Sequence, residues 1–409
     1  MVRAMRRNVM RKKILAAVLV MMMVLLAGCD TSVIAPTSGV IKETEQKEEQ
    51  ELAAAEEENS GDEEVEDEVE TTEEEEEVDE DSEEEEIPIF RSNFTGEEIT
   101  YNYLDHRPLA VMLNNIKEGC PQSGIEEASI VYECPVEGRI TRLMGIFEKY
   151  EEIPKIGSIR SSRDYYVYAA LEFDAIYAHF GQATVYVGDL LNSTAVDNIS
   201  GAVSGIEKPA KNAFYRSNDR KAPHNVYISN EGILKDREEL GYRSTLRLGF
   251  IKKFTYPELG ERVTYDDAKD AVVLYPGGKT TTASNGFSKV GARFEYNEQD
   301  GKYYRYQYGG EHIDAETGNQ LKYDNVVFQY CNGIVRDNKD YLAFGQLGDN
   351  VDKVQVFTNG KMVEGTWKRT EMFEPTKYYD KDGNEIVVNT GKTWVCLIWN
   401  DYADDVVIE

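Results

Sequence analysis

The sequence predicts an α+β protein in which a mixed α/β domain, residues 87–246, precedes a mostly antiparallel β domain, residues 263–409. In the first stretch, short apolar runs alternate with segments of helical periodicity. In the second, short alternating runs are separated by Asn-Gly or Asp-Gly pairs, which indicates a small barrel or sandwich built of hairpins. All 26 tyrosines lie at or after Tyr101, so globular sequence begins there. Residues 247–262, which include Pro257 and Gly260, form the predicted joint.

The elements of the N-terminal domain follow from local patterns. Three apolar runs predict buried strands, and two periodic segments predict helices. Ser161 or Ser162 is the expected cap of the first helix, and Ser229 introduces the second. The order of the strands in the sheet is left open. The expected strands are residues 109–113, 129–133 and 174–180, and the expected helices are residues 163–173 and 230–240.

The C-terminal domain is predicted from its turns. Three turn dipeptides each divide two alternating runs, and residues 393–399 form an expected closing strand. The hairpins are 292–297 with 303–308, 353–357 with 362–367, and 376–379 with 385–388.

The chain begins like a bacterial lipoprotein. Six basic residues precede an apolar run, residues 14–27, and Leu26-Ala27-Gly28-Cys29 resembles the lipobox. We expect a signal peptide at residues 1–28 and diacylglycerol, with palmitate-type acylation, on Cys29. The run is short of the ~20 residues that cross a bilayer, although an uncleaved signal anchor is the alternative. Lipid-anchored attachment to the extracytoplasmic face of the cell membrane follows, with a Gram-negative outer membrane left open.

The net charge of −31 is concentrated in one segment. Residues 42–86 contain 27 acidic residues and two lysines, with no aromatic residue. Such a segment buries too little apolar surface to fold. We interpret residues 29–86 as the lipidated cysteine and a disordered acidic tether, with weak Ca²⁺ capture as the alternative. Since no basic stripe is present, nucleic acid is not an expected partner.

Four cysteines follow Cys29, two in each predicted domain. In an exported protein an even number favours disulfides, and three connectivities exist. The simplest connectivity joins Cys120 to Cys134. This bridge would close a short loop and stabilise the folded protein by ~3 kcal/mol. A second bridge, Cys331 to Cys396, is left open, and four buried thiols are the alternative.

Several catalytic and metal-binding motifs are missing from the sequence. It contains no phosphate loop, Gly-x-Ser-x-Gly elbow, His-Glu-x-x-His pair or paired Cys-x-x-Cys. Four histidines make a histidine-rich metal site improbable. We therefore expect no metal and no cofactor.

A candidate anion site lies at the start of the first predicted helix. Arg160 and Arg163 stand at its positive end, where a cation is disfavoured by ~0.3–1 kcal/mol. A bound phosphate or carboxylate would compensate, held by Arg142, Arg160, Ser161, Arg163 and Asn225. Internal ion pairs with Asp164, Glu133 or Glu137 are the alternative.

An enzyme is the competing interpretation. His179 ends an apolar run and His224 begins another, so either imidazole is a candidate general base beside the arginines. Glu133 or Glu137 would supply a second acid–base group. The reaction class would be hydrolysis of a cell-wall bond.

A series of motifs resembles the YerB-like lipoprotein family. The resemblance covers about residues 97–400 and implies a two-part extracytoplasmic region behind a lipidated cysteine. Family members usually lack cysteine at positions 120 and 134, so the joint occurrence here favours pairing. The family's activity is unassigned. The motifs are residues 107–115, 121–124, 137–142, 157–164, 179–181, 222–225, 365–367 and 391–394.

Together these patterns predict a surface-tethered binding or accessory protein of the cell envelope. Its expected partners are the membrane, through Cys29, and an anionic wall-polymer fragment or a wall-synthesis protein. A structural or chaperone-like module that docks a membrane protein is a third interpretation.

Overall fold

The structure, a computed structural model, describes residues 90–99, 103, 105–201, 204–280, 285–346 and 348–409. The signal peptide, Cys29 and the acidic tether lie outside the described residues. Within them the predicted α+β class is confirmed, because several sheets are accompanied by short helices. No helix in these ranges is long and apolar enough to cross a membrane.

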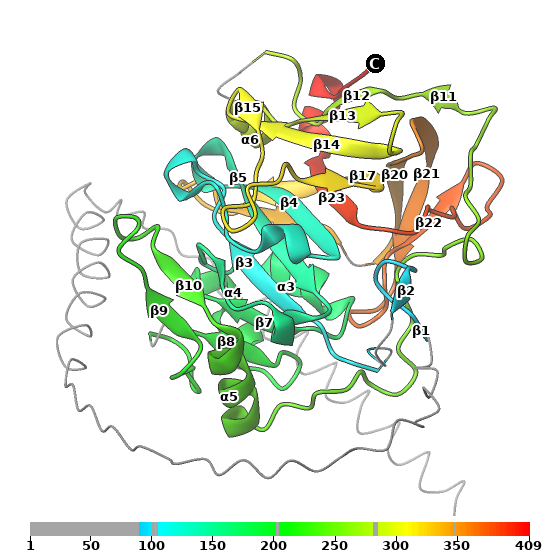
Figure 1. The fold of residues 1–409 in the computed structure, drawn as a ribbon. Coiled ribbons are helices and arrows are strands. Elements are labelled where there is room, and N and C mark those ends of the chain that lie inside the picture. The colour runs from blue at the N-terminus through cyan, green and yellow to red at the C-terminus, as the bar shows by residue number, and fades with distance from the viewer. Residues whose placement is uncertain (1–89, 100–102, 104, 202–203, 281–284, 347) are drawn as a thin grey trace, which may run out of the picture. The chain divides into compact units, whose positions relative to one another are not determined.

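One large sheet runs through the described part of the chain (Figure 1). Its order is β11-β21-β20-β17-β23-β4-β5-β3-β7-β8, and β22 pairs with β21. The strands are β3 (Leu109–Leu113), β4 (Ile130–Val136), β5 (Ile140–Phe147), β7 (Ile176–His179), β8 (Asn198–Ser200), β11 (Lys269–Asp270), β17 (Asn325–Cys331), β20 (Gly348–Thr358), β21 (Lys361–Arg369), β22 (Lys377–Asp380) and β23 (Thr393–Trp399).

The predicted domains meet inside this sheet. Strand β23 pairs in parallel with both β17 and β4, with Cys396 opposite Phe328 on one side and Glu133 on the other. The expected closing strand is therefore central rather than terminal. The division at residues 247–262 stays a prediction, and strands from both sides of it belong to one sheet within the compact unit Glu84–Glu409.

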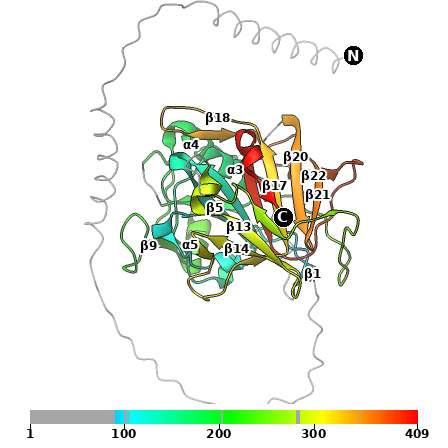
Figure 2. The ribbon, with the colours of Figure 1, turned by 90° about the horizontal axis from the view of Figure 1, so that it is seen from above.

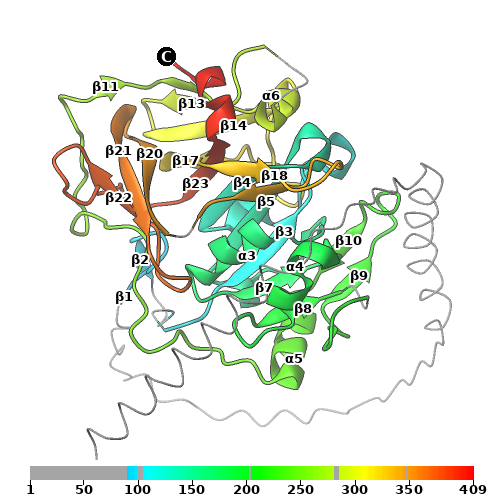
Figure 3. The same cartoon turned by 180° about the vertical axis from the view of Figure 1, so that it is seen from behind.

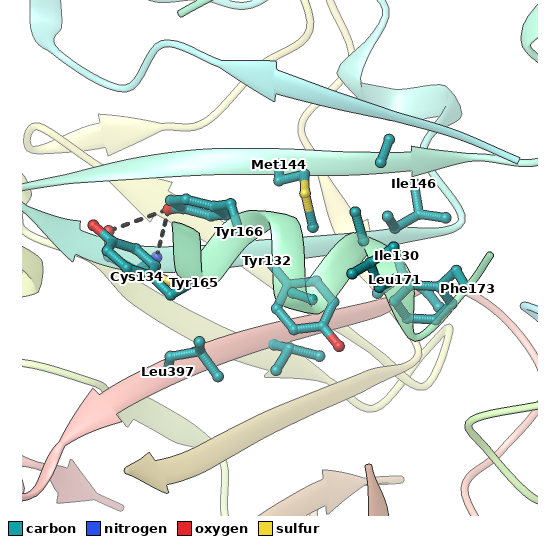
Figure 4. Close-up of a cluster of buried hydrophobic side chains, with 14 of the residues drawn as sticks. Ile130, Tyr132, Cys134, Met144, Ile146, Tyr165, Tyr166, Leu171, Phe173 and Leu397 are labelled. Carbon is teal, nitrogen blue, oxygen red and sulfur yellow. Dashed lines mark hydrogen bonds between the residues drawn. The ribbon is translucent and has the colours of Figure 1, made fainter. Parts of the chain in front are cut away.

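Helix α3 (Asp164–Leu171) covers one face of the sheet. Tyr132 and Met144, on neighbouring strands β4 and β5, share a buried cluster with Tyr165 and Tyr166 of the helix (Figure 4). The Tyr165 hydroxyl donates to the Pro135 carbonyl at 2.9 Å. Helix α4 (Thr184–Leu191) lies beside α3 (Figure 3). The face of the sheet around β4 and β5 is thus fixed by aromatic packing against α3.

The opposite face carries a second sheet, of order β15-β14-β13-β12-β24 with β16 paired to β14. Phe294 and Tyr303 of this sheet share a buried cluster with Val131 and Trp394 of the large sheet. These strands are β12 (Val273–Tyr275), β13 (Arg293–Asn297), β14 (Lys302–Gln307), β15 (Gly310–Glu311), β16 (Lys322–Tyr323) and β24 (Val407–Ile408), with helix α6 (Gly286–Val290) beside them.

Smaller elements complete the fold. Seen from above, β20–β22 lie on the side opposite β9 (Figure 2). The small strands are β1 (Phe90–Arg91) with β2 (Glu98–Ile99), β6 (Ile156–Gly157) with β10 (Val226–Ile228) and β9 (Phe214–Arg216), and β18 (Gly333–Val335) with β19 (Leu342–Phe344). The remaining helices are α5 (Asn230–Leu240), η2 (Lys117–Gly119), η3 (Ile125–Glu127), η4 (Glu137–Arg139), η5 (Tyr150–Glu152) and η6 (Asn400–Asp405).

Local signals explain several boundaries. The Ser229 hydroxyl accepts from Gly232 N at 3.1 Å and starts α5, as predicted. Asn359 and Gly360 have φ of 50° and 71°, so they turn β20 back into β21 as the sequence predicts. The expected serine cap of α3 is wrong, because Arg163 is the N-cap residue and no side chain caps the helix.

Candidate functional site

Arg142, Arg160 and Arg163 gather at the start of α3, and we call them the arginine cluster. Arg142 lies on β5, whereas Arg160 and Arg163 lie in the segment between β6 and α3. Two backbone contacts fix this segment against β3: Ile159 bridges Leu113, and Arg160 N donates to the Met112 carbonyl at 3.0 Å. These contacts therefore bring Arg142 together with two arginines that follow it by 18 and 21 positions in the sequence.

Two of the three guanidinium groups have internal partners. Arg163 donates from Nε and Nη2 to Glu137 of η4, at 2.8 and 2.6 Å. Arg142 is buried, and its Nη1 donates to the Ser161 carbonyl at 2.7 Å. Ser161 thus contributes its backbone oxygen to the cluster. The internal ion pair considered from the sequence exists for Arg163 with Glu137.

Arg160 differs from its neighbours. Its partly buried guanidinium makes no hydrogen bond or ion pair with the described residues. Burial and the charge of Arg163 lower the pKa of Arg160. Burial, Arg163 and Arg160 also lower the pKa of Arg142. Because Glu137 is the carboxylate paired with this group of three cations, the described cluster has an excess of positive charge.

The carboxylate of Glu137 is stabilised by the same contacts. Burial opposes its ionisation, but the hydrogen bonds and charge of Arg163 outweigh burial and lower the pKa of Glu137. The same pair raises the pKa of Arg163. Tyr341 covers Arg163, with the guanidinium carbon 5.4 Å from the ring centroid. Glu137 therefore lies in the cluster as an ionised counter-ion.

His224 is electrostatically coupled to Arg160. Burial, Arg160 and Arg220 lower the pKa of His224, and its Nδ1 lies 3.0 Å from Asn114 Nδ2. The next residue, Asn225, is buried and bonded to Arg216 and to the Ser217 carbonyl, both at 2.9 Å. The structure thus brings His224 towards the arginine cluster, while the Asn225 amide is bonded within the turn between β9 and β10.

His179 is fully buried at the end of β7. Its Nδ1 lies 2.9 Å from the Gly181 carbonyl, and its ring lies 5.3 Å from the Tyr177 ring. Burial lowers the pKa of His179 to about 4. The imidazole is therefore neutral at pH 7 and packed inside the fold.

Glu133 belongs to a different polar group, buried between the two sheets. Arg305 Nη2 lies 2.9 Å from its carboxylate, and both side chains have zero exposure. The Thr141 hydroxyl and the Trp394 indole also donate to it, at 2.7 and 3.2 Å. Glu133 therefore joins β4 to β14 and β23, away from the contacts of the arginine cluster.

The expected disulfide between Cys120 and Cys134 is wrong, and the bridge left open between Cys331 and Cys396 is not formed either, since all four described cysteines are free. Cys331 and Cys396 lie on neighbouring strands but in buried clusters on opposite faces of the sheet. Cys134 packs against α3, whereas Cys120 contacts Gln122 and Gln307 at 3.6 and 3.5 Å. Burial raises the pKa of Cys120 to about 12, which favours the neutral thiol.

Three buried cations, Arg305, Lys253 and Arg369, were not identified from the sequence. Arg305 occupies an inward position of β14, whose residues alternate strictly between partly buried and buried. Because alternate residues of a strand face the same side, this pattern places Arg305 on the same inward face as Tyr303. The sequence could therefore have indicated that Arg305 is buried. Lys253 and Arg369 converge on Glu172 across more than 80 positions, and no local pattern predicts that convergence. The described residues contain no group of three or more side chains arranged to hold a metal ion.

Comparison with known proteins assigns the chain to a family. Residues 94–243 match the N-terminal domain, and residues 262–395 the C-terminal domain, of a protein family of unknown function, DUF3048. The chain belongs to this family. Residues 244–261, between the two matches, overlap the joint expected at residues 247–262, whose bounds stay a prediction.

One relative of the chain has a name, and its crystal structure is known. The chain is 28% identical over 313 residues to "Putative lipoprotein YerB" of Bacillus subtilis (strain 168), covering 75% of this chain and 86% of the relative. The crystal structure of YerB from Bacillus subtilis matches with a TM-score of 0.65 and 25% identity, covering 78% of this chain and 99% of that one. The family resemblance expected from the motifs is therefore confirmed.

Proposed function

We propose that this DUF3048 protein is an extracytoplasmic lipoprotein, anchored through lipid on Cys29, whose folded body binds an anionic ligand at the arginine cluster. The lipobox at residues 26–29 and the name of the relative support the lipid anchor. The proposed site is extracytoplasmic, at the outer face of the cell membrane.

The guanidinium of Arg160, which has no partner among the described residues, carries the binding proposal. A partly buried cation beside Arg142 and Arg163 has an unfavourable environment until an anion reaches it. Arginine favours planar or tetrahedral oxyanions, because its donors pair with two oxygens at once. The ligand we propose is therefore a phosphate- or carboxylate-bearing fragment of a wall polymer.

The hydrolase alternative has less support. His179 is sealed inside the fold with a low pKa, and Glu133 is held by Arg305, Thr141 and Trp394. His224 remains near Arg160, and a bound anion would favour its protonation. We assign His224 to ligand recognition, with binding strengthening as pH falls and its imidazole gains a proton.

Isothermal titration of the full-length protein with inorganic phosphate tests the proposal. Arg160→Ala is expected to weaken phosphate binding at least tenfold, which is about 1.4 kcal/mol. Arg293→Ala is the matched control, since Arg293 is paired with Glu295 on β13, outside the cluster. Equal affinity in wild type and Arg160→Ala would rule out the arginine cluster as the site.

A further inference from the structure

A cavity with an acidic lining lies apart from the arginine cluster. Its volume is about 530 Å³, within the range of small-molecule sites. Segments from both predicted domains line it, and we call it the acidic cavity. The lining includes seven carboxylate residues and three lysines: Glu97, Glu98, Glu127, Glu148, Glu152, Asp314, Glu316, Lys149, Lys155 and Lys392.

Glu148 and Asp314 are the deeply buried carboxylates among them, and both oxygens of Asp314 accept hydrogen bonds from backbone N–H groups. Only 4% of Glu148 is exposed, and its Oε1 has no hydrogen-bond partner among the residues that the structure describes. Its Oε2 accepts one hydrogen bond, from the Ser92 hydroxyl at 2.7 Å. Burial raises the pKa of Glu148 to about 7, against the opposing effects of Ser92 and Lys149. A buried carboxylate with one free oxygen is costly unless a donor reaches it.

The three lysines of the cavity already have other contacts. Lys155 Nζ pairs with Glu316 at 2.9 Å, and Lys392 donates to the Glu126 carbonyl. Lys149 Nζ lies 5.5 Å from the centre of the Tyr103 ring. None of these contacts satisfies Glu148, and the lining carries more acidic than basic side chains. The cavity therefore favours a cationic group.

We propose that the acidic cavity binds the primary ammonium group of an organic ligand, with the Glu148 carboxylate as its counter-ion. An ammonium group supplies three donors, and a free carboxylate oxygen is the matching acceptor. The volume exceeds that of an ammonium ion, so the ligand extends beyond the charged group. An amino sugar and a lysine-like side chain carry this shared chemistry.

Release of the Glu148 proton on ligand binding can be measured on the wild-type protein, without a variant. A group with a pKa near 7 is about nine-tenths protonated at pH 6, and the ammonium requires the ionised form. Binding of a lysine-type ammonium, which stays protonated over this range, should therefore release a larger fraction of a proton at pH 6 than at pH 8. The charged or titratable groups around Glu148 are Glu97, Lys149 and Tyr256.

Calorimetry of the full-length protein in buffers of different ionisation enthalpy measures this release. Glucosamine and Nα-acetyl-lysine amide are the two ammonium probes, and N-acetylglucosamine is the uncharged control. Glu148→Gln should weaken ammonium binding at least tenfold and abolish proton release between pH 6 and 8. Glu311→Gln, at an exposed site outside the cavity, should change neither.

The results distinguish the two ligand classes from each other and from failure of the proposal. Binding of glucosamine alone assigns an amino sugar, and binding of the lysine amide alone assigns a side-chain amine. Binding of N-acetylglucosamine as tight as that of glucosamine, or proton release by the lysine amide that does not change from pH 6 to 8, overturns the proposal even where Glu148→Gln fails to fold. Because phosphate is not a probe here, these outcomes are independent of the anion site.

Discussion

Lys253 Nζ lies 2.6 Å from Glu172 Oε2, and both side chains are about 1% exposed. Arg369 Nη1 reaches the other oxygen of Glu172 at 3.2 Å. Lys253 comes from the predicted joint, Glu172 ends α3 and Arg369 ends β21. This buried triad connects three segments that the sequence assigns to different parts of the chain.

Removing the shared anion of the triad should be strongly destabilising. Glu172→Gln leaves Lys253 and Arg369 buried without a counter-ion, so we expect the free energy of unfolding to fall by ~3–5 kcal/mol. Urea unfolding followed by fluorescence measures it. Glu364→Gln is the control, because its pair with Lys353 is largely exposed and contributes ~0–1 kcal/mol. Similar losses in the two variants would contradict the structural role of the triad.

The buried pair of Glu133 and Arg305 should show strong coupling. Glu133→Gln or Arg305→Met alone is expected to cost ~3–5 kcal/mol, since each leaves one charge uncompensated. The double variant should lose at least ~1 kcal/mol less than the sum of the single losses. A double-mutant cycle from denaturant unfolding measures this coupling. Additive losses would show that the two charges do not act as a pair.

Glu148 should make stability depend on pH. Its pKa in the folded protein is about 7, above the value of ~4.3 for a free side chain, so the folded state binds more protons between these values. Stability contributed by protonated Glu148 is therefore present below pH 4 and is lost as pH rises to 7, by on the order of 2–3 kcal/mol. Glu148→Gln should remove this loss. Parallel curves of unfolding free energy from pH 5 to 8 would contradict it.

Thiol chemistry tests the cysteines. In the protein with lipid on Cys29, four free thiols are expected after denaturation without reductant, at Cys120, Cys134, Cys331 and Cys396. In the native protein their reaction with a thiol reagent should be slow, because burial raises the pKa of Cys120 and of the other three. A count of two, or a fall in melting temperature on adding reductant, would indicate a disulfide.

Local structure was predictable where one segment decides it. Strand β3, strand β23 and helix α5 have the predicted bounds, because apolar runs and the Ser229 cap specify them. The hairpin turn at Asn359 and Gly360 needs positive φ, which this pair adopts readily. Such signals depend on neighbouring residues and need no knowledge of the whole fold.

Long-range pairing was not predictable. Parallel pairing of β23 with β4 joins residues more than 250 positions apart, and the sequence of neither strand indicates which strand it pairs with. The Ser162 hydroxyl accepts from Tyr177 at 2.9 Å, so a distant side chain occupies the expected cap of α3. The sequence therefore located Arg142, Arg160 and Arg163 as a cluster but assigned Glu133 to the same site, whereas the fold holds it between the sheets.

The proposed function depends most on the guanidinium of Arg160 binding an anion. Unfolding of wild type and Arg160→Gln, with and without phosphate, tests this most directly. In plain buffer the variant should unfold within ~0.5 kcal/mol of wild type, because its guanidinium has no described partner to lose. Phosphate at 100 times the dissociation constant of wild type should stabilise wild type by ~2.7 kcal/mol, and the variant by no more than ~1.4 kcal/mol if its affinity is at least tenfold weaker. A loss above ~1.5 kcal/mol in plain buffer, or equal stabilisation of both proteins by phosphate, would contradict the account.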